Sequence, residues 1–575
     1  MNFNHDRTCD FSSRRSVVLS PNVAVASSQP LATEAGVQVL RAGGSAADAA
    51  VAVASALQVT QACSTGLGGD AFCLYYEADG GRVHAYNGSG RSPAALTLDV
   101  ARRAADAEPG AGRDPGVGGR RGSADQRADG AAGTASPTHL PDYHAHTVTV
   151  PGAADAWAEV HRRFGRLALG DVLAPAIRFA EEGFSLEPMA AGWWAAGAER
   201  QLSAHRHGGE LMLNGRAPRV GERFRNPGLA SVFRELADGG RDAFYRGWVA
   251  ERIVAELEHE GGVMTLDDLA AHRGEWVEPV SLDYDGYRVW ECPPNGQGLA
   301  ALLALGTYRT LRDDAGANEA MRIHYQIEAM RLAFADAARF VADPDFAPAP
   351  LAGLLDPEYL ARRAALVDPA RAMAHVGPGI PASSVGDDTV YFSVVDADGN
   401  GCSFINSNFM GFGTGIVPRG CGFSLQNRGR GFVLEAGHAN ALEPRKRPYH
   451  TIIPGLLTSE DGGLAAVFGV MGGMMQPQGH LQVVCRLVDE RLDPQSALDA
   501  PRFQLADGDP DGTVLVEDSF PGAVVEELRS LGHDVAPVSG ARRALFGLGQ
   551  VIATGDERML WSGSDPRGDG YAGGF

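Results

Sequence analysis

The segment from Gly386 to Phe409 restricts the fold of this chain more than any other, because it contains two apolar runs joined by a turn. The first run, TVYFSVV, starts at Thr389 and is β-branched and aromatic on both faces. DADGN is typical of a hairpin turn, and GCSFINSNF is typical of the returning strand. A hairpin that is apolar on both faces needs cover on both sides, so the segment predicts a layered fold.

Most predicted helices precede this hairpin, and the chain is richer in predicted strands from it onward. PLATEAGVQVLRAGGSAADAAVAVASALQVT predicts two helices that break at Gly43 and Gly44, with Ser45 as the N-cap of the second. GLGGDAFCLYYEADGGRVHAYNG predicts a β-hairpin with DGG in its turn. This distribution is consistent with α+β layers.

Two polar stretches interrupt the pattern. From Arg102 to His139, Gly, Ala, Arg and Asp dominate, and Val117 is the only large aliphatic residue. Such a composition buries too little apolar surface to offset the entropy of ordering, so we expect a disordered insertion at 102–139. The loop from Gly379 to Asp388 is also polar, and we expect it to be mobile.

The composition excludes several classes of protein. The chain has 575 residues, 44% of them hydrophobic and 21% charged, which fits a globular protein with a sizeable core. Its formal net charge of −21 argues against partners such as nucleic acid or an anionic membrane. The N-terminus has no apolar signal region, and no run is long enough to span a membrane, so we expect a cytoplasmic protein.

The cysteines and histidines indicate neither disulfides nor metal. Seven cysteines are scattered along the chain without a C-x-x-C pair, and we expect them to be buried thiols. The histidines lack the H-E-x-x-H spacing, and His450 and His480 are more simply structural. No P-loop or dinucleotide fingerprint is present, so no cofactor is predicted.

Thr389 follows two aspartates directly at the start of the predicted strand. A threonine hydroxyl is a weak nucleophile that needs an adjacent base, and its own α-amino group serves when the threonine is N-terminal. An internal threonine gains that group only if the bond before it is cut. From the residues alone, an ordinary strand threonine is the simpler interpretation.

Three other motifs have both a functional and a structural interpretation. In VFGVMGGMMQPQG, the N–H groups of Gly472 and Gly473 could converge on an oxyanion, or the pair could be a tight turn. Arg91 in GSGRSPAAL could clamp a carboxylate or form a structural ion pair. A basic group could line an anionic pocket or form a solvated face. Its members are Arg428, Arg430, Arg445, Lys446 and Arg447.

Taken together, these segments resemble the γ-glutamyltransferase family of N-terminal-nucleophile hydrolases over most of the chain. The first half contributes VASSQPLATEAGVQVLRAGGSAADAAVAVASALQVT, GLGGDAF, VPGAADAWAEVHRRFG, DDLAAHRGEW and EAMRLAFADAARFVADPDF. The second half contributes TVYFSVVDADGN, FGTGIV, GVMGG, DAPRF and SDPRGD. The number, order and spacing of these segments carry the resemblance.

The resemblance implies a four-layer αββα sandwich made as one precursor that cuts itself between Asp388 and Thr389. The products, residues 1–388 and 389–575, would stay entwined as a heterodimer within one αββα domain, and this unit could dimerise further. Thr389 would be the nucleophile, and Ser407 would support its free α-amino group. Gly472 and Gly473 would donate to the oxyanion. Neither a metal nor an organic cofactor is implied.

The chain departs from the family where γ-glutamyl enzymes recognise their substrate. Ser89 stands at the position of the carboxylate-binding arginine, with Arg91 two residues later, and Phe409 replaces an asparagine. Gly431 stands at the position of the acid that binds the substrate amino group, and Lys446 and Arg447 replace a serine pair. The departures resemble cephalosporin (glutaryl) acylase-like and oxamate amidohydrolase-like members.

We therefore expect a small-molecule amide whose acyl group carries a carboxylate but no α-ammonium group. Its carboxylate would be bound by Arg91 and by one or more of Arg428, Arg430 and Arg447. Two alternatives remain open at this point: a true γ-glutamyl hydrolase or transferase acting on glutathione-like amides, and a non-catalytic family member that is never cut and acts as a binding protein.

Overall fold

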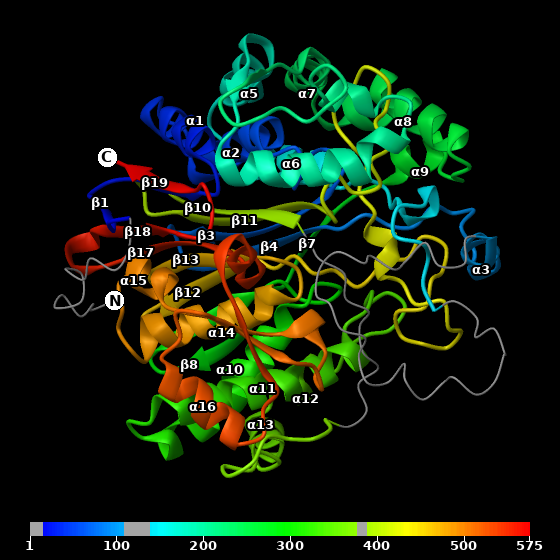
Figure 1. Ribbon diagram of the computed structural model, residues 1–575. Helices are drawn as coiled ribbons and strands as arrows, with labels where there is room; N and C mark the ends of the chain where they lie inside the picture. Colours follow the sequence, from blue (N-terminus) through cyan, green and yellow to red (C-terminus); the bar gives the residue numbers. More distant parts are fainter. Residues whose placement is uncertain (1–14, 108–137, 377–387) are drawn as a thin grey trace.

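Four layers make up the computed structural model, which describes residues 15–107, 138–376 and 388–575 (Figure 1). Two seven-stranded sheets lie face to face, and helices cover the outer face of each sheet. This arrangement is the αββα sandwich that the resemblance implies.

The first sheet has the order β19-β2-β10-β11-β3-β4-β7, and all neighbouring strands are antiparallel. Its strands are β19 (Tyr571–Gly574), β2 (Ala24–Ser27), β10 (Asp388–Val395), β11 (Gly401–Phe409), β3 (Asp70–Glu77), β4 (Arg82–Gly88) and β7 (Glu275–Val277). The helices on its side are α1 (Pro30–Arg41), α2 (Ala46–Thr60), α4 (Ala153–Phe164), α5 (Leu169–Glu182), α6 (Pro188–Arg200), α7 (Pro227–Arg246), α8 (Trp248–His259) and α9 (Leu266–Ala271).

The second sheet has the order β1-β18-β17-β13-β12-β9-β8 and is also antiparallel throughout. Its strands are β1 (Val18–Ser20), β18 (Leu560–Ser564), β17 (Leu548–Thr554), β13 (Leu464–Met471), β12 (Gly455–Ser459), β9 (Tyr287–Glu291) and β8 (Val280–Tyr284). The helices on its side are α10 (Gly298–Ala315), α11 (Glu319–Phe340), α12 (Leu351–Leu354), α13 (Pro357–Ala364), α14 (Met475–Val488), α15 (Pro494–Asp499) and α16 (Gly522–Ser530).

The remaining elements are small. The short strands are β14 (Phe503–Leu505), β15 (Val514–Glu517), β16 (Val535–Val538), β5 (Phe184–Ser185) and β6 (Arg223–Phe224). The 3₁₀ turns are η3 (Ala145–Thr147), η4 (Leu202–Ala204), η5 (Gly208–Leu211), η6 (Arg428–Gly431), η7 (Ala506–Gly508), η8 (Gly540–Phe546) and η9 (Asp556–Arg558).

The predicted hairpin β10–β11 lies in the middle of the first sheet and is confirmed. Helix α2 contacts both strands on one side, and β13 contacts both on the other. Every residue of β11 is buried. This two-sided cover is the physical reason why the hairpin is apolar on both faces.

The two helices predicted before the first hairpin are also confirmed as α1 and α2. Ser45 caps α2: its side chain accepts from the N–H of Asp48, and the Asp48 carboxylate accepts from the N–H of Ser45. All residues of α2 are buried, because it lies between the sheet and the outer helices α4 and α5.

Both sheets mix strands from the two sides of the Asp388–Thr389 bond. In the first sheet, β10, β11 and β19 pair with β2 and β3, which come from the first half of the chain. In the second, β12 pairs with β9, and β18 pairs with β1. In Figure 1 blue strands accordingly lie beside yellow and red ones.

The predicted insertion at 102–139 is wrong at both ends. Residues 102–107 belong to helix α3 (Leu98–Ala107), whose Ala101 and Ala105 are buried. At the other end, the carbonyl of Thr138 accepts from the N–H of Leu434. Residues 108–137 and the predicted mobile loop up to residue 387 lie outside the described residues.

Six cysteines lie in the described part of the chain, and all six are buried. Among the described helices, none combines the length and the apolar character needed to cross a membrane.

Candidate active site

Thr389 is the second residue of β10, and its side chain is completely buried. Its hydroxyl donates a hydrogen bond to the hydroxyl of Ser407 on β11, with 3.2 Å between the two oxygens. The pairing register shifts here: Asp388 lies opposite Phe409 and Val390 opposite Asn406, so Thr389 faces two residues. Such bulges re-aim side chains and are common next to active sites.

Three donors converge on the Ser407 hydroxyl oxygen. Besides Thr389, it accepts from the backbone N–H of Phe409 at 2.9 Å and from Nη2 of Arg428 at 3.0 Å. Ser407 is fully buried, so these bonds fix its position next to Thr389. The sequence-predicted pair is thus brought together by adjacent strands.

Arg428 starts the 3₁₀ turn η6 and is fully buried. Its Nη1 donates to the hydroxyl of Thr451 at 2.7 Å. The guanidinium carbon lies 4.1 Å from the centre of the Phe409 ring, which is a cation–π contact. A buried cation is thereby held one side chain away from Thr389.

Gly472 and Gly473 form the turn that leaves β13, with φ values of +124° and +53°. A Cβ at Gly472 would lie 3.1 Å from the Cα of Gly547, so the turn also needs a small residue. The side-chain amide of Gln297 donates to the carbonyl of Gly473 at 2.9 Å and to that of Thr451 at 2.6 Å. Residues that contact one another therefore connect Thr389 to this turn, through Ser407, Arg428, Thr451 and Gln297.

Arg91 and Arg447 lie in a separate cluster with three carboxylates. Arg91 contacts Asp343 at 3.0 Å and Asp345 at 2.8 Å, and Arg447 contacts Glu275 at 2.8 Å. Burial acts to lower the pKa of Arg91, but the three carboxylates outweigh it and the pKa is raised. The geometry therefore corresponds to the ion-pair interpretation of Arg91.

Arg430 lies two residues after Arg428 but pairs with a different partner. Its Nε donates to the carboxylate of Asp142 at 2.7 Å, and both side chains are buried. Lys446 is buried as well and contacts Glu443 at 2.8 Å, whereas Arg445 is exposed. Arg428, one of the four arginines predicted to bind substrate, contacts Ser407 of the Thr389–Ser407 pair.

Asp70 and His450 are buried beside this site and were not predicted as functional. The Asp70 carboxylate accepts from the N–H groups of Gly90 and Gly152, from Gln426, and from Nε2 of His450 at 3.1 Å. Burial and the nearby Arg428 cation lower the pKa of His450 to about 4, although Asp70 acts in the opposite direction. His450 is therefore neutral at pH 7.

The glycines of the motif GLGGD are the sequence signal that could have identified Asp70 as part of this site. A Cβ at Gly69 would lie 2.1 Å from the carbonyl oxygen of Ser407, and one at Gly68 would lie 2.0 Å from that of Ser424. Only glycine permits this approach, which lets Asp70 start β3 directly opposite Ser407 on β11.

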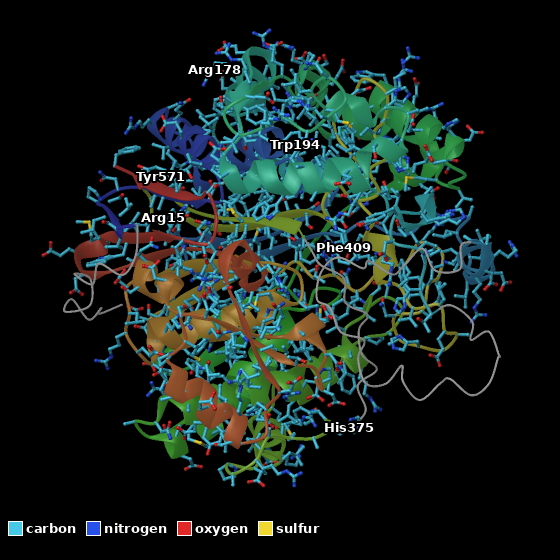
Figure 2. All side chains as sticks on the ribbon, viewed as in Figure 1. Arg15, Arg178, Trp194, His375, Phe409 and Tyr571 are labelled. Carbon is cyan, nitrogen blue, oxygen red and sulfur yellow. The ribbon has the colours of Figure 1, made fainter. Side chains whose placement is uncertain are left out.

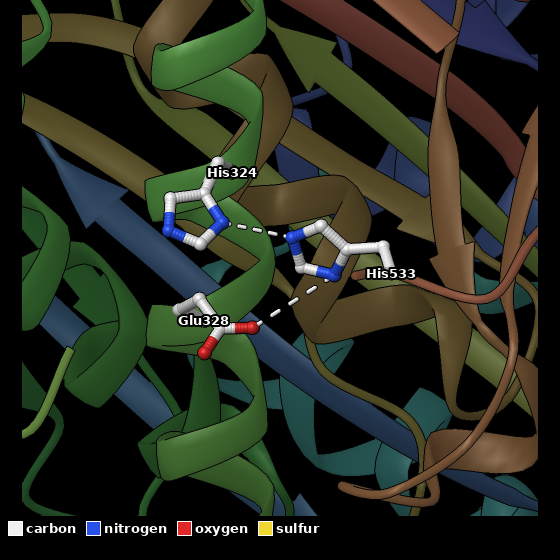
Figure 3. A group of neighbouring side chains, drawn as sticks. All are labelled: His324, Glu328 and His533. Atoms are coloured by element: carbon white, nitrogen blue, oxygen red, sulfur yellow. Dashed lines mark hydrogen bonds and ion pairs between the residues drawn. The ribbon is translucent and has the colours of Figure 1, made fainter. Parts of the chain in front are cut away.

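Outside this site, His324, Glu328 and His533 form a buried group on the side of the second sheet (Figure 3). His324 Nδ1 lies 2.8 Å from His533 Nε2, and His533 Nδ1 lies 3.9 Å from Glu328. His324 and Glu328 lie on the same helix, α11, and both face the His533 ring in Figure 3, and Arg331 lies 3.3 Å from Glu328. The Arg331 cation next to Glu328 disfavours a metal ion at this group, and burial raises the pKa of the Glu328 carboxyl group to about 7.

The chain was also compared with known proteins. The γ-glutamyltranspeptidase family matches residues 32–123 and 121–575. A glutathione hydrolase-like YwrD proenzyme of Bacillus subtilis is 37% identical, and the match covers 96% of this chain and 99% of that protein. An oxamate amidohydrolase proenzyme of Klebsiella pneumoniae is 33% identical, with 95% and 97% covered.

A solved structure gives the same result. The crystal structure of a cephalosporin acylase from Bacillus halodurans superposes with a TM-score of 0.85 and 41% identity, covering 99% of this chain and 98% of that one. Since family and fold agree along the whole chain, the protein belongs to the γ-glutamyltranspeptidase family and has the N-terminal-nucleophile hydrolase fold.

Proposed function

We propose that this member of the family is a self-processing threonine amidohydrolase whose nucleophile is Thr389. The observation that carries the proposal is the buried hydrogen bond between Thr389 and Ser407 at the bulge that starts β10. The proenzyme names of two relatives support a cut precursor.

The self-processing step needs only groups of this chain and water. The Thr389 hydroxyl oxygen attacks the carbonyl carbon of Asp388, the C–N bond breaks, and the acyl group moves from nitrogen to oxygen. Water then hydrolyses the ester, which leaves a carboxylate on residue 388 and a free α-amino group on Thr389. Because the two sheets share strands from both products, we expect the products to remain one heterodimer.

In the mature enzyme, the α-amino group of Thr389 acts as the base. It takes the hydroxyl proton while the oxygen attacks the substrate carbonyl, and the tetrahedral oxyanion accepts hydrogen bonds from the Gly472 and Gly473 N–H groups. The amine leaves with that proton, and water or another amine then cleaves the acyl-enzyme ester. Ser407 holds the nucleophile in place throughout.

For the substrate, we propose an amide with a carboxylate on its acyl group and no α-ammonium group. Arg428 supports this class, since it lies one residue from the nucleophile through Ser407 and would repel an ammonium group there. We assign the carboxylate to Arg428 first, because its guanidinium contacts Ser407 next to the proposed nucleophile. Arg91, Arg430 and Arg447 come after it, since each forms an ion pair with a carboxylate of the protein.

The cut is tested with a denaturing gel and N-terminal sequencing of the smaller band. Wild type should give a product starting at Thr389, Thr389→Ala a single full-length band, and Thr389→Ser a largely cut product. A wild-type chain that stays whole, with Thr389→Ala indistinguishable from it, would instead support the non-catalytic binding protein.

The acyl group is tested with amides of one amine that carry γ-glutamyl, glutaryl, oxamate-type or neutral acyl groups. We expect the glutaryl or oxamate-type amide to be cleaved best. The second candidate, a γ-glutamyl hydrolase, is favoured by the name of the glutathione hydrolase-like relative. Much faster cleavage of the γ-glutamyl amide would select it.

A further inference from the structure

Phe409, the last residue of β11, has a backbone conformation that a phenylalanine rarely adopts. Its φ is +80°, in the left-handed region where glycine and asparagine are tolerated and a bulky side chain is strained. The side chain is 7% exposed and lies at the level of the two sheets (Figure 2). Strain of this kind persists only where the surroundings impose it, and it clusters at functional sites.

Both the backbone and the side chain of Phe409 contact the candidate active site. Its backbone N–H donates to the Ser407 hydroxyl at 2.9 Å, and its ring lies under the guanidinium of Arg428 at 4.1 Å. It also pairs across the bulge with Asp388, the residue before the proposed cut. One strained residue thus touches the support of the nucleophile, the buried cation and the scissile segment.

The positive φ connects these contacts physically. The angle φ is a rotation about the N–Cα bond, so once the N–H is fixed on Ser407, φ decides where the side chain lies. At +80° the ring is directed beneath Arg428. Glycine would adopt the same φ without strain but has no ring, so the strained backbone is explained by what the ring contacts.

We propose that Phe409 is the positioning residue of this site: its N–H holds Ser407, and its ring holds Arg428 against Ser407, for both the self-processing cut and turnover. The inference rests on the proposed function of Thr389. It assigns a role to Phe409, which the sequence analysis noted only as a departure from the family.

The test separates the ring from the backbone. Phe409→Tyr keeps the ring, Phe409→Leu keeps apolar volume without a π face, and Phe409→Gly relieves the strain without a ring. Phe412→Leu is the matched control, because Phe412 is a buried phenylalanine of the loop that follows β11 and packs against Trp194 on α6. Each variant is assayed for its rate of self-cleavage, for kcat and KM on the best amide, for the pH dependence of kcat/KM, and for Tm.

We expect Phe409→Leu and Phe409→Gly to slow both reactions about tenfold or more, as loss of a desolvated cation–π contact would. Phe409→Tyr should stay within about twofold of wild type, and Phe412→Leu should lower Tm without slowing either reaction. Phe409→Gly should lower Tm by less than deletion of an unstrained buried phenylalanine would, because relief of the strain offsets part of the cost of the lost ring, and both reactions of the folded protein should slow.

The pH profile gives an independent readout. The Arg428 cation disfavours a second positive charge on the α-amino group of Thr389, so it lowers that group's pKa. When Phe409→Leu loosens Arg428, the acid limb of kcat/KM should move to higher pH. Wild-type rates and an unmoved profile in Phe409→Leu and Phe409→Gly would overturn the inference, whereas an uncut wild-type chain would overturn the proposed function instead.

Discussion

Two regions of this molecule hold arginines in different ways. Around Arg428, two hydroxyls and an aromatic ring contact the guanidinium next to Thr389. Around Arg91 and Arg447, the contacts are three carboxylates. A carboxylate already in contact competes with any substrate anion, so the number of basic residues in a loop does not identify the one that binds substrate.

The largest effect should follow from Arg428→Gln. This change removes the proposed anchor and a charged donor to Ser407, so kcat/KM for the carboxylate-bearing amide should fall about 10³-fold, and less for a neutral amide. Arg91→Gln should stay within about threefold of wild type, and Arg178→Gln, on the exposed face of α5, controls for net charge (Figure 2). Steady-state kinetics on both amides make the measurement.

A reversal of these two effects would contradict the proposed difference between the two regions. If Arg91→Gln lost more activity on the carboxylate-bearing amide than Arg428→Gln, the ion-paired cluster would be the substrate site. The four-arginine expectation from the sequence would then be correct in its emphasis on Arg91.

How much of this could be read from the sequence depends on the range of the contacts. The cap of α2 and the β10–β11 hairpin have local signals, and both were predicted correctly. The Gly-rich tail has no strand signal, yet Tyr571–Gly574 forms β19, because β2 offers it an unpaired edge. Pairing with β2, more than 500 residues away in the chain, therefore overrides the low strand propensity of this glycine-rich segment.

The site divides in the same way. Thr389 and Ser407 were predicted from the family resemblance, and the structure brings the two side chains together because they lie on the paired strands β10 and β11. The carboxylates around Arg91 could not be predicted, since Asp343 and Glu275 lie roughly 200 residues from it in sequence. Phe409 was noted only as a departure from the family, because a positive φ cannot be recognised in a phenylalanine from its sequence.

The second prediction concerns stability. The Asp343 side chain is fully buried and accepts from Arg91 and from the N–H of Arg447. Asp343→Ala leaves these donors without their acceptor and should lower the free energy of unfolding by about 3 kcal/mol. Activity of the folded protein should change little. Urea unfolding and kinetics of the same preparation measure both, and a loss of activity as large as that of Arg428→Gln would contradict the separation of the two regions.

The third prediction concerns His450, which lies near Arg428. We expect this histidine to make the folded protein less stable in mild acid. His450 has a folded pKa of about 4, below the unfolded value of about 6.5. As pH falls from about 6.5 to 4, His450 binds a proton in the unfolded state but not in the folded state. The free energy of unfolding therefore falls by at most about 3 kcal/mol. His450→Gln should remove this slope. An unchanged slope in that variant would show that other groups carry it.

The smallest effect should come from the ion-paired side and in a lower pH window. Burial acts to raise the pKa of Glu275, but Arg447 and Arg91 outweigh it and the pKa is lowered. A carboxyl group with a depressed folded pKa contributes stability above its unfolded value of about 4.3, and this contribution is lost as pH falls through the folded pKa. Because Glu275 is half exposed, solvent screens the ion pairs and the contribution is small.

Thermal unfolding should therefore separate wild type from Glu275→Gln at pH 7 but not at the lowest pH at which both remain folded. If the gap widened in acid, the arginines would not be stabilised by this carboxylate, and Arg447 would become a candidate for binding substrate.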